Sequence, residues 1–506
     1  MSGVWLDRLE RAGNRLPDPA TLFLAGTLVV MGLSHLAVTL GWSVEKTVRQ
    51  GEALTRELVT PVSLLDSDGL WWAISGLVDN FVRFPPLGLV LVGLLGIGLA
   101  ERSGLLPALL RRAIGAAPAP LLVPATVFVG ILSSLALDAG YLVLPPLAAG
   151  LFLAAGRSPL TGIAAATAGV TAGFSANLVI TGLDPLLAGL TTAGARVLDA
   201  DYEVAITANW WFMIASTLVL TAAGAWVTRR LVEPRLKGIA IAEVETAKAP
   251  DRGLEDRGLR AAGVAFVLVM ALVLALALIP GAPLHGTGGR FPRWMEALVP
   301  LLLLIFLSLG LAYGIAARTI RSDHDAVAMM TETLRGMAPY LVLAFFAAQF
   351  IAFFSHSRLG EMLAVTGGDW LAGLGVAPAG LMIAFVALVM LANLLVGSAS
   401  AKYALFAPVF VPMFMQAGIS PELTQAAYRV GDSVTNGITP FNPYLIIILA
   451  FVRRYRPDAG LGTLLALMLP YTLVFALVWG LLLGVWVTAG WELGPGGGLT
   501  YPAAAR

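Results

Sequence analysis

Five charged residues lie inside or beside long apolar stretches of this sequence: Asp138, Asp184, Lys402, Arg429 and Asp432. Charged side chains within a membrane are costly, so they usually pair with one another or serve a binding site. Arg429 and Asp432 are three positions apart, which places them on one helix face, where they could form an ion pair that only holds the structure. Alternatively, Asp432 binds a cation or proton, and the planar guanidinium of Arg429 binds a carboxylate through two parallel hydrogen bonds.

Lys402 and Asp138 occupy similar places in two apolar segments. Each follows a cluster of small residues that predicts the tip of a hairpin, at 130–134 for Asp138 and at 397–400 for Lys402. The sequence leaves two alternatives open for both residues. They face a cavity within the protein, or they are surface residues because the tip reaches water.

Small and polar residues interrupt two further apolar segments. The first is cut at 173–177 and 181–185, and the second at 431–436 and 439–440. Irregular backbone at membrane depth must be buried in protein or line a wet cavity. Its free carbonyls, with Ser, Thr and Asn side chains such as Asn177, are ligands for a hard cation such as sodium, and half-helix N-termini favour anions. Helix packing through small residues is the simpler alternative, but it explains four matching clusters poorly.

The composition requires lipid as the main solvent. The chain has 506 residues, of which 58% are hydrophobic and 12% charged, whereas soluble domains carry about 25% charged residues. A net charge of +1 argues against a nucleic-acid partner. The absence of cysteine excludes disulfides and thiolate zinc sites. No resident cofactor is expected.

The apolar pattern predicts an all-α polytopic membrane protein with about nine transmembrane helices plus two re-entrant hairpins. Two of the nine helices are discontinuous. The hairpins are expected at 119–155 and 377–417, and the discontinuous helices at 159–194 and 421–453. Continuous spans are expected at about 20–42, 84–101, 208–230, 258–280, 296–318, 337–355 and 462–489.

These elements recur in the same order. Residues 1–257 form the predicted first repeat, 258–280 a linking span, and 281–506 the second repeat. An odd number of crossings between them makes the repeat inverted, as in many secondary transporters. The basic residues gather mostly on the side of the N-terminus, which predicts a cytoplasmic N-terminus.

Several motifs together resemble the p-aminobenzoyl-glutamate transporter (AbgT) family over nearly the full length. They are 63–70 (SLLDSDGL), 174–178 (FSANL), 184–189 (DPLLAG), 397–401 (GSASA), 428–436 (YRVGDSVTN), 460–463 (GLGT), 469–471 (LPY) and 494–496 (GPG).

The resemblance implies nine spans and two hairpins, a homodimer in the bacterial inner membrane surrounded by lipid, and an aqueous cavity in each protomer. It also implies uptake of p-aminobenzoyl-glutamate and export of sulfonamides. Family transport residues map onto Asp184, Ser400, Tyr403, Arg429, Asp432 and Pro440, and a sodium site resembling the family's would use Asn393, Gly397 and Asp432. The family often has Trp where this chain has Tyr403, which would stack on an aryl ring through its own ring.

The leading hypothesis is therefore a secondary transporter of a small molecule, coupled to sodium or protons. The alternatives are a transporter of another small carboxylate and a channel built on the same repeat. An enzyme is not expected, because the sequence lacks the HExxH and GxSxG motifs.

Overall fold

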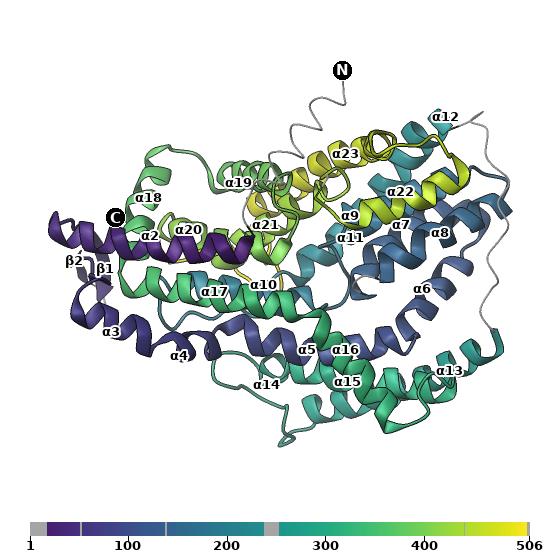
Figure 1. Cartoon of the computed structure of the whole chain (residues 1–506), viewed down its shortest axis with the longest axis horizontal. Coiled ribbons are helices and arrows are strands. Elements are labelled where there is room, and N and C mark those ends of the chain that lie inside the picture. Colours follow the sequence, from purple (N-terminus) through teal and green to yellow (C-terminus); the bar gives the residue numbers. More distant parts are fainter. Residues whose placement is uncertain (1–17, 51–52, 137–138, 237–251, 440, 503–506) are drawn as a thin grey trace.

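The computed structural model describes residues 18–50, 53–136, 139–236, 252–439 and 441–502. Asp138 and Pro440, both singled out in the sequence, lie outside the described residues. Helices dominate the described chain (Figure 1). The predicted helical, multi-pass membrane fold is confirmed.

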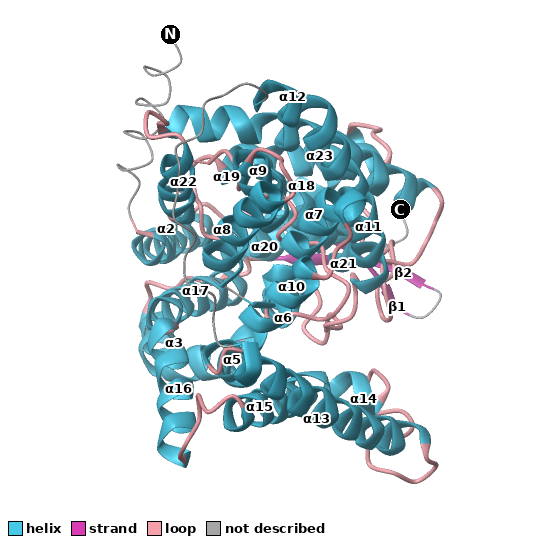
Figure 2. Ribbon diagram, turned by 90° about the vertical axis from the view of Figure 1, so that its right-hand side faces the viewer, coloured by secondary structure: helices cyan, strands magenta, loops and turns pink. Residues whose placement is uncertain are grey.

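Seven described helices are long and apolar enough to cross a membrane, and each overlaps one predicted continuous span. They are α2 (Pro19–Thr39), α5 (Pro85–Arg102), α11 (Trp210–Val227), α13 (Arg252–Leu278), α15 (Leu298–Ala316), α17 (Ala338–His356) and α23 (Leu461–Thr488). A π-helical turn, η3 (Thr228–Val232), and α12 (Glu233–Leu236) extend α11. Figures 1 and 2 show α5, α13 and α15 together on one side of the molecule, in agreement with their contacts.

Each predicted hairpin consists of two helices that are shorter than the roughly 20 residues needed to cross a bilayer. The first contains α7 (Leu122–Leu132) and α8 (Ala139–Ala154), with the 3₁₀ turns η1 (Ala119–Leu121) and η2 (Ser133–Ala136). The second contains α19 (Pro378–Asn393) and α20 (Ala399–Gln416).

Both predicted discontinuous helices contain a break that overlaps the predicted polar clusters, although 431–434 and 183–185 are helical. In the first, α9 (Pro159–Thr171) and α10 (Leu183–Ala195) flank a break at 172–182. In the second, α21 (Pro421–Val434) and α22 (Tyr444–Tyr455) flank a break at 435–443. Every residue of α9 and α21 is buried, because α7 and α8 pack against α9 while α19, α20 and α23 pack against α21.

Glycines allow these helices to approach closely. A Cβ atom on Gly169 of α9 would lie 2.5 Å from the carbonyl oxygen of Val127 and 2.8 Å from the Cα of Gly130 on α7. A Cβ atom on Gly431 of α21 would lie 2.7 Å from the carbonyl oxygen of Val386 on α19. The first half of each discontinuous helix thus packs closely against the backbone of a hairpin helix.

Gly169→Ala is expected to destabilise the protein, because the added methyl group meets backbone atoms that cannot move independently. Overpacking of this kind costs about 1–3 kcal/mol. The midpoint of thermal unfolding in detergent should fall relative to Gly150→Ala, a control glycine of α8 with open space around its Cβ position. Equal midpoints for the two variants would contradict this packing argument.

Several elements were not predicted. Helix α6 (Leu105–Gly115) precedes the first hairpin and α18 (Leu359–Gly373) the second, with bends of 115° and 117° into the following helices. Strands β1 (Val44–Gln50) and β2 (Ala53–Val59) form an antiparallel pair with Val44 opposite Val59, a local exception to the all-α expectation. The short helix α14 (Arg293–Glu296) was not predicted either. By contrast, α3 (Ser67–Ser75), α4 (Leu77–Val82) and α16 (Asp323–Gly336) overlap segments 68–83 and 321–336, whose amphipathic pattern predicts a helix at the membrane surface or in a solvated loop.

The motif at 63–70, one of those that resemble the family, has a structural role at the start of α3. Asp66 caps α3 by accepting a hydrogen bond from the backbone N–H of Gly69 at 2.7 Å. A Cβ atom on Gly69 would lie 2.4 Å from the carbonyl oxygen of Ser63, so only glycine fits this turn. The motif at 63–70 therefore fixes the start of α3.

Candidate functional site

The first buried ion pair joins the two discontinuous helices. Arg429 of α21 donates from Nη1 to Oδ1 of Asp184 on α10 at 2.6 Å. Its Nη2 donates to the backbone oxygen of Ser175, in the first break, at 2.9 Å. Both charged side chains are almost fully buried. The guanidinium therefore connects α21 with both the break and the second half of the first discontinuous helix.

Asp184 also organises the backbone at the start of α10. Its Oδ2 accepts hydrogen bonds from the backbone N–H of Thr181 at 2.7 Å and from the Thr181 hydroxyl at 2.9 Å. A carboxylate in the first helical turn is stabilised by the positive end of the helix dipole. Asp184 thus accepts the hydrogen bonds of Thr181 at the end of the break and also neutralises the charge of Arg429.

The second buried ion pair joins the second hairpin to the second discontinuous helix. Lys402, in the first turn of α20, places Nζ 2.7 Å from Oδ1 of Asp432 on α21. Asp432 Oδ1 also accepts a hydrogen bond from the Tyr428 hydroxyl at 3.2 Å. The Lys402 side chain is only 1% exposed, so the alternative in which Lys402 lies at the surface is excluded in this structure.

The suggested pairing of Arg429 with Asp432 is wrong in this structure. The two residues share a helix, as predicted, but each meets an opposite charge on another element, Asp184 on α10 and Lys402 on α20. Two cations and two carboxylates balance. Replacing either partner alone would leave an uncompensated buried charge, which typically costs about 3–5 kcal/mol.

Asn393 ties the end of α19 to the second break. Its Nδ2 lies 2.7 Å from the backbone oxygen of Asp432 and 2.8 Å from both Thr435 Oγ1 and Asn436 Oδ1. Its Oδ1 accepts a hydrogen bond from Lys402 Nζ. Asn393 and Asp432, two members of the predicted sodium site, are therefore brought together around the Lys402 ammonium.

Gly397 and Ser400 occupy the tip of the second hairpin. Gly397 is exposed, and a Cβ atom there would lie 2.7 Å from the backbone oxygen of Phe441, so the tip touches the second break. Ser400 is partly buried, and its hydroxyl lies 3.3 Å from that of Ser398. The recorded contacts thus place both residues at the rim of the buried network.

Tyr403 lies inside the protein. Its ring stacks on Tyr428 with centroids 4.1 Å apart, and its hydroxyl lies 2.8 Å from that of Thr191. The Thr191 hydroxyl in turn donates to Gln425 Oε1 at 2.7 Å. Stacking of a bound molecule on Tyr403 stays a prediction, because in this structure Tyr428 covers one face of the ring.

Sequence reasoning missed Thr191, Gln425 and Tyr428. A signal was present on α21, where Gln425, Tyr428, Arg429 and Asp432 follow helical spacing and so form one polar stripe on a helix. Thr191 carried no comparable signal, since threonines are frequent in the surrounding segment.

Several buried polar atoms around the breaks have no hydrogen-bond partner among the residues that the structure describes. Both amide atoms of Asn177 are in this state, as are Arg429 Nε, Gln425 Nε2 and Thr439 Oγ1. Native proteins pair more than about 90% of their buried polar groups, and each unpaired group costs roughly 1–3 kcal/mol. These atoms therefore mark where water or a polar solute can bind. Asn177, predicted from the sequence, belongs to this set.

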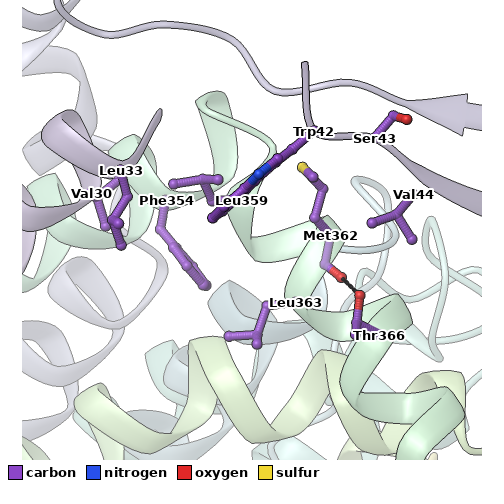
Figure 3. Close-up of a pocket in the computed structure, with 10 residues that line it drawn as sticks. All are labelled: Val30, Leu33, Trp42, Ser43, Val44, Phe354, Leu359, Met362, Leu363 and Thr366. Carbon is purple, nitrogen blue, oxygen red and sulfur yellow. Dashed lines mark hydrogen bonds between the residues drawn. The ribbon is translucent and has the colours of Figure 1, made fainter. Parts of the chain in front are cut away.

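A cavity of about 420 Å³ lies elsewhere, between α2, β1, α17 and α18 (Figure 3). Its lining is mostly apolar, with Trp42, Phe354 and Met362 around it, and Thr366 donates its hydroxyl hydrogen to the Met362 backbone oxygen. None of the predicted site residues that the structure describes lines this cavity. Within the described residues, no cluster of three or more His, Cys, Asp or Glu side chains could hold a metal ion.

The chain is similar in sequence to known transport proteins. Residues 4–501 match the model of the AbgT putative transporter family. The chain is 37% identical to the p-aminobenzoyl-glutamate transport protein of Escherichia coli K12, over 98% of this chain and 97% of that protein.

Two solved structures of transporters are similar. The YdaH transporter of Alcanivorax borkumensis, described as having an unusual topology, matches with a TM-score of 0.89 and 45% identity, over 95% of this chain and 100% of that one. MtrF of Neisseria gonorrhoeae, described as illuminating a class of antimetabolite efflux pumps, matches with a TM-score of 0.90 and 40% identity, over 99% of this chain and 100% of that one.

Proposed function

The chain belongs to the AbgT transporter family, and from this premise we propose that it is a cation-coupled secondary transporter of p-aminobenzoyl-glutamate or of sulfonamide-type p-aminobenzoate analogues. As a member of that family it is a multi-pass membrane transport protein and not an enzyme.

The observation that carries the proposal is the pair of buried ion pairs at the two helix breaks. p-Aminobenzoyl-glutamate has two carboxylates, an amide and an aryl ring. A carboxylate can replace Asp184 as the partner of Arg429, whose Nε has no partner within the described part of the chain. The amide can pair with the free amide atoms of Asn177. Tyr403 supplies an aromatic ring in the same region.

Alternating access follows from the same contacts. The Arg429–Asp184 pair connects the two predicted repeats, 1–257 and 281–506. The Lys402–Asp432 pair connects the second hairpin with the second discontinuous helix. Exchange of a partner at either pair weakens a contact that holds these segments together. Binding at the site therefore favours a rearrangement of one segment against another. The residues 258–280 link the repeats.

The coupling ion is a proton or sodium, because Asp432 can serve either. The proposed setting is a homodimer in the bacterial inner membrane, surrounded by lipid, with a cytoplasmic N-terminus. The name of the Escherichia coli relative gives the solute and no direction, whereas MtrF is described with antimetabolite efflux pumps, which supports outward transport.

Counterflow in proteoliposomes tests the transporter against a channel. Vesicles loaded with unlabelled p-aminobenzoyl-glutamate should transiently accumulate the labelled compound from outside, because a transporter exchanges its solute across the membrane. Equilibration without accumulation would favour a channel. Exchange of another small carboxylate, with none of p-aminobenzoyl-glutamate, would favour the alternative substrate class.

Asn177→Ala separates a binding role from a structural one. Because neither amide atom has a partner in the described ranges of the chain, the free energy of unfolding of the variant should lie within about 1 kcal/mol of the wild-type value. Affinity for p-aminobenzoyl-glutamate should fall about 10-fold, which corresponds to about 1.4 kcal/mol of binding energy. Asn393→Ala is the matched control, since it removes several hydrogen bonds and should lower the unfolding midpoint. Unchanged affinity in Asn177→Ala would remove Asn177 from the site.

A further inference from the structure

The Lys402 ammonium contacts the same side-chain oxygens, those of Asn393 and Asp432, that would bind sodium in the predicted site. Nζ contacts Asp432 Oδ1 at 2.7 Å, Asn393 Oδ1, and the backbone oxygen of Val396 at 3.4 Å. A lysine ammonium has three N–H donors, and here three oxygens from α19, the hairpin tip and α21 surround it. The predicted sodium set of Asn393, Gly397 and Asp432 therefore does not fit a metal ion in this conformation, because the position is taken.

Two cations cannot share this position. Lys402 and Asp432 are 1% and 2% exposed as side chains, so water screens a second positive charge poorly. Among the described residues, the groups that contact Asn393 and Asp432 beside this cage are the hydroxyls of Tyr428 and Thr435 and the amide of Asn436, which add no carboxylate. A metal ion and the ammonium must therefore occupy the Asn393–Asp432 oxygens one at a time.

We propose that Lys402 is a built-in competitor of the coupling cation, a tethered ammonium that keeps the Asn393–Asp432 oxygens closed to sodium until it moves away. The proposal rests on the proposed function only in its choice of sodium as the competing ion. The lysine has a flexible four-carbon stem, and Lys402 follows directly on the hairpin tip, where Gly397 is exposed. A movement of the tip would therefore carry the ammonium with it.

The charge balance of the site also indicates that Lys402 and a metal ion compete for the same oxygens. Arg429 and Lys402 balance Asp184 and Asp432. Removal of the Lys402 charge leaves Asp432 as an uncompensated buried carboxylate beside the Asn393 oxygen. Such a site attracts a small cation from solution, so loss of the lysine should create sodium affinity instead of abolishing it.

Binding of sodium to the purified full-length protein tests this directly. ²²Na⁺ binding and the thermal midpoint are measured while sodium replaces choline at constant ionic strength. Lys402→Met should bind sodium at least 10-fold more tightly than the wild type, and Lys402→Gln should behave similarly. The double variant Lys402→Met/Asp432→Asn should lose this gain. Lys46→Met, which removes a lysine paired with Glu361 at a distance from the site, should match the wild type.

Equal or weaker sodium binding in both folded Lys402 variants would overturn the proposal. If neither variant folds, the proposal is tested on the wild type. The extent of reductive methylation of Lys402 is then measured by mass spectrometry in sodium and in choline. Sodium should increase methylation of Lys402 severalfold over choline, and unchanged methylation would overturn the proposal. Neither readout uses a transported solute, so a failure of the proposed transport function would be seen separately, in the vesicle assays.

Discussion

Asp432→Asn is expected to lower p-aminobenzoyl-glutamate transport about 100-fold, equivalent to about 2.7 kcal/mol at the rate-limiting step. Asparagine keeps the size of the side chain and an oxygen for the Tyr428 hydroxyl. It removes the charge that balances Lys402 and that would hold the coupling ion. The measurement is the initial rate of labelled solute uptake into proteoliposomes, normalised to folded protein.

The control for this substitution is Asp458→Asn. Asp458 pairs with Arg456 at the surface and is 72% exposed, so its loss should leave transport unchanged. Because Asp432→Asn leaves Lys402 buried without its carboxylate, a lower unfolding midpoint is expected as well. Wild-type transport rates in folded Asp432→Asn protein would remove Asp432 from the coupling site.

Arg429→Lys is expected to lower transport at least about 10-fold, or about 1.4 kcal/mol. The two terminal nitrogens of Arg429 reach different partners, Asp184 and Ser175, at 2.6 and 2.9 Å. A lysine ammonium keeps the charge but cannot reproduce this planar fork or offer it to a carboxylate. Kinetics should show a higher KM for the solute, because recognition of its carboxylate is weakened.

Arg456→Lys is the matched control, since Arg456 lies at the surface and its bond to Asp458 is replaceable. The thermal midpoint distinguishes a structural role from a binding role. A lower midpoint with unchanged KM and unchanged rate per folded molecule would show that Arg429 only holds the two broken helices together.

The sequence predicted the spans and breaks because their signals are local. A run of about 20 apolar residues specifies a crossing, as in α15 and α17. Clusters of glycine and polar residues inside such a run mark an interruption, as between α9 and α10. Helices α6 and α18 were not predicted because each is too short to cross a membrane alone and bends sharply into the next helix.

Pairing in the site could not be read from the sequence, because it depends on contacts between distant segments. Arg429 and Asp184 are 245 positions apart, and only the crossing of α10 and α21 brings them together. The three-residue spacing of Arg429 and Asp432 suggested the wrong pair for the same reason. Lys402 was identified as a charge in an apolar segment, but its position on Asn393 and Asp432 depends on how the second hairpin packs.

The most direct measurement is uptake of radiolabelled p-aminobenzoyl-glutamate by the purified wild-type protein in proteoliposomes, with sodium and pH gradients imposed separately. One of these gradients is expected to drive accumulation above the external concentration, and collapse of that gradient should abolish the accumulation. Solute that only equilibrates under both gradients would contradict cation-coupled transport.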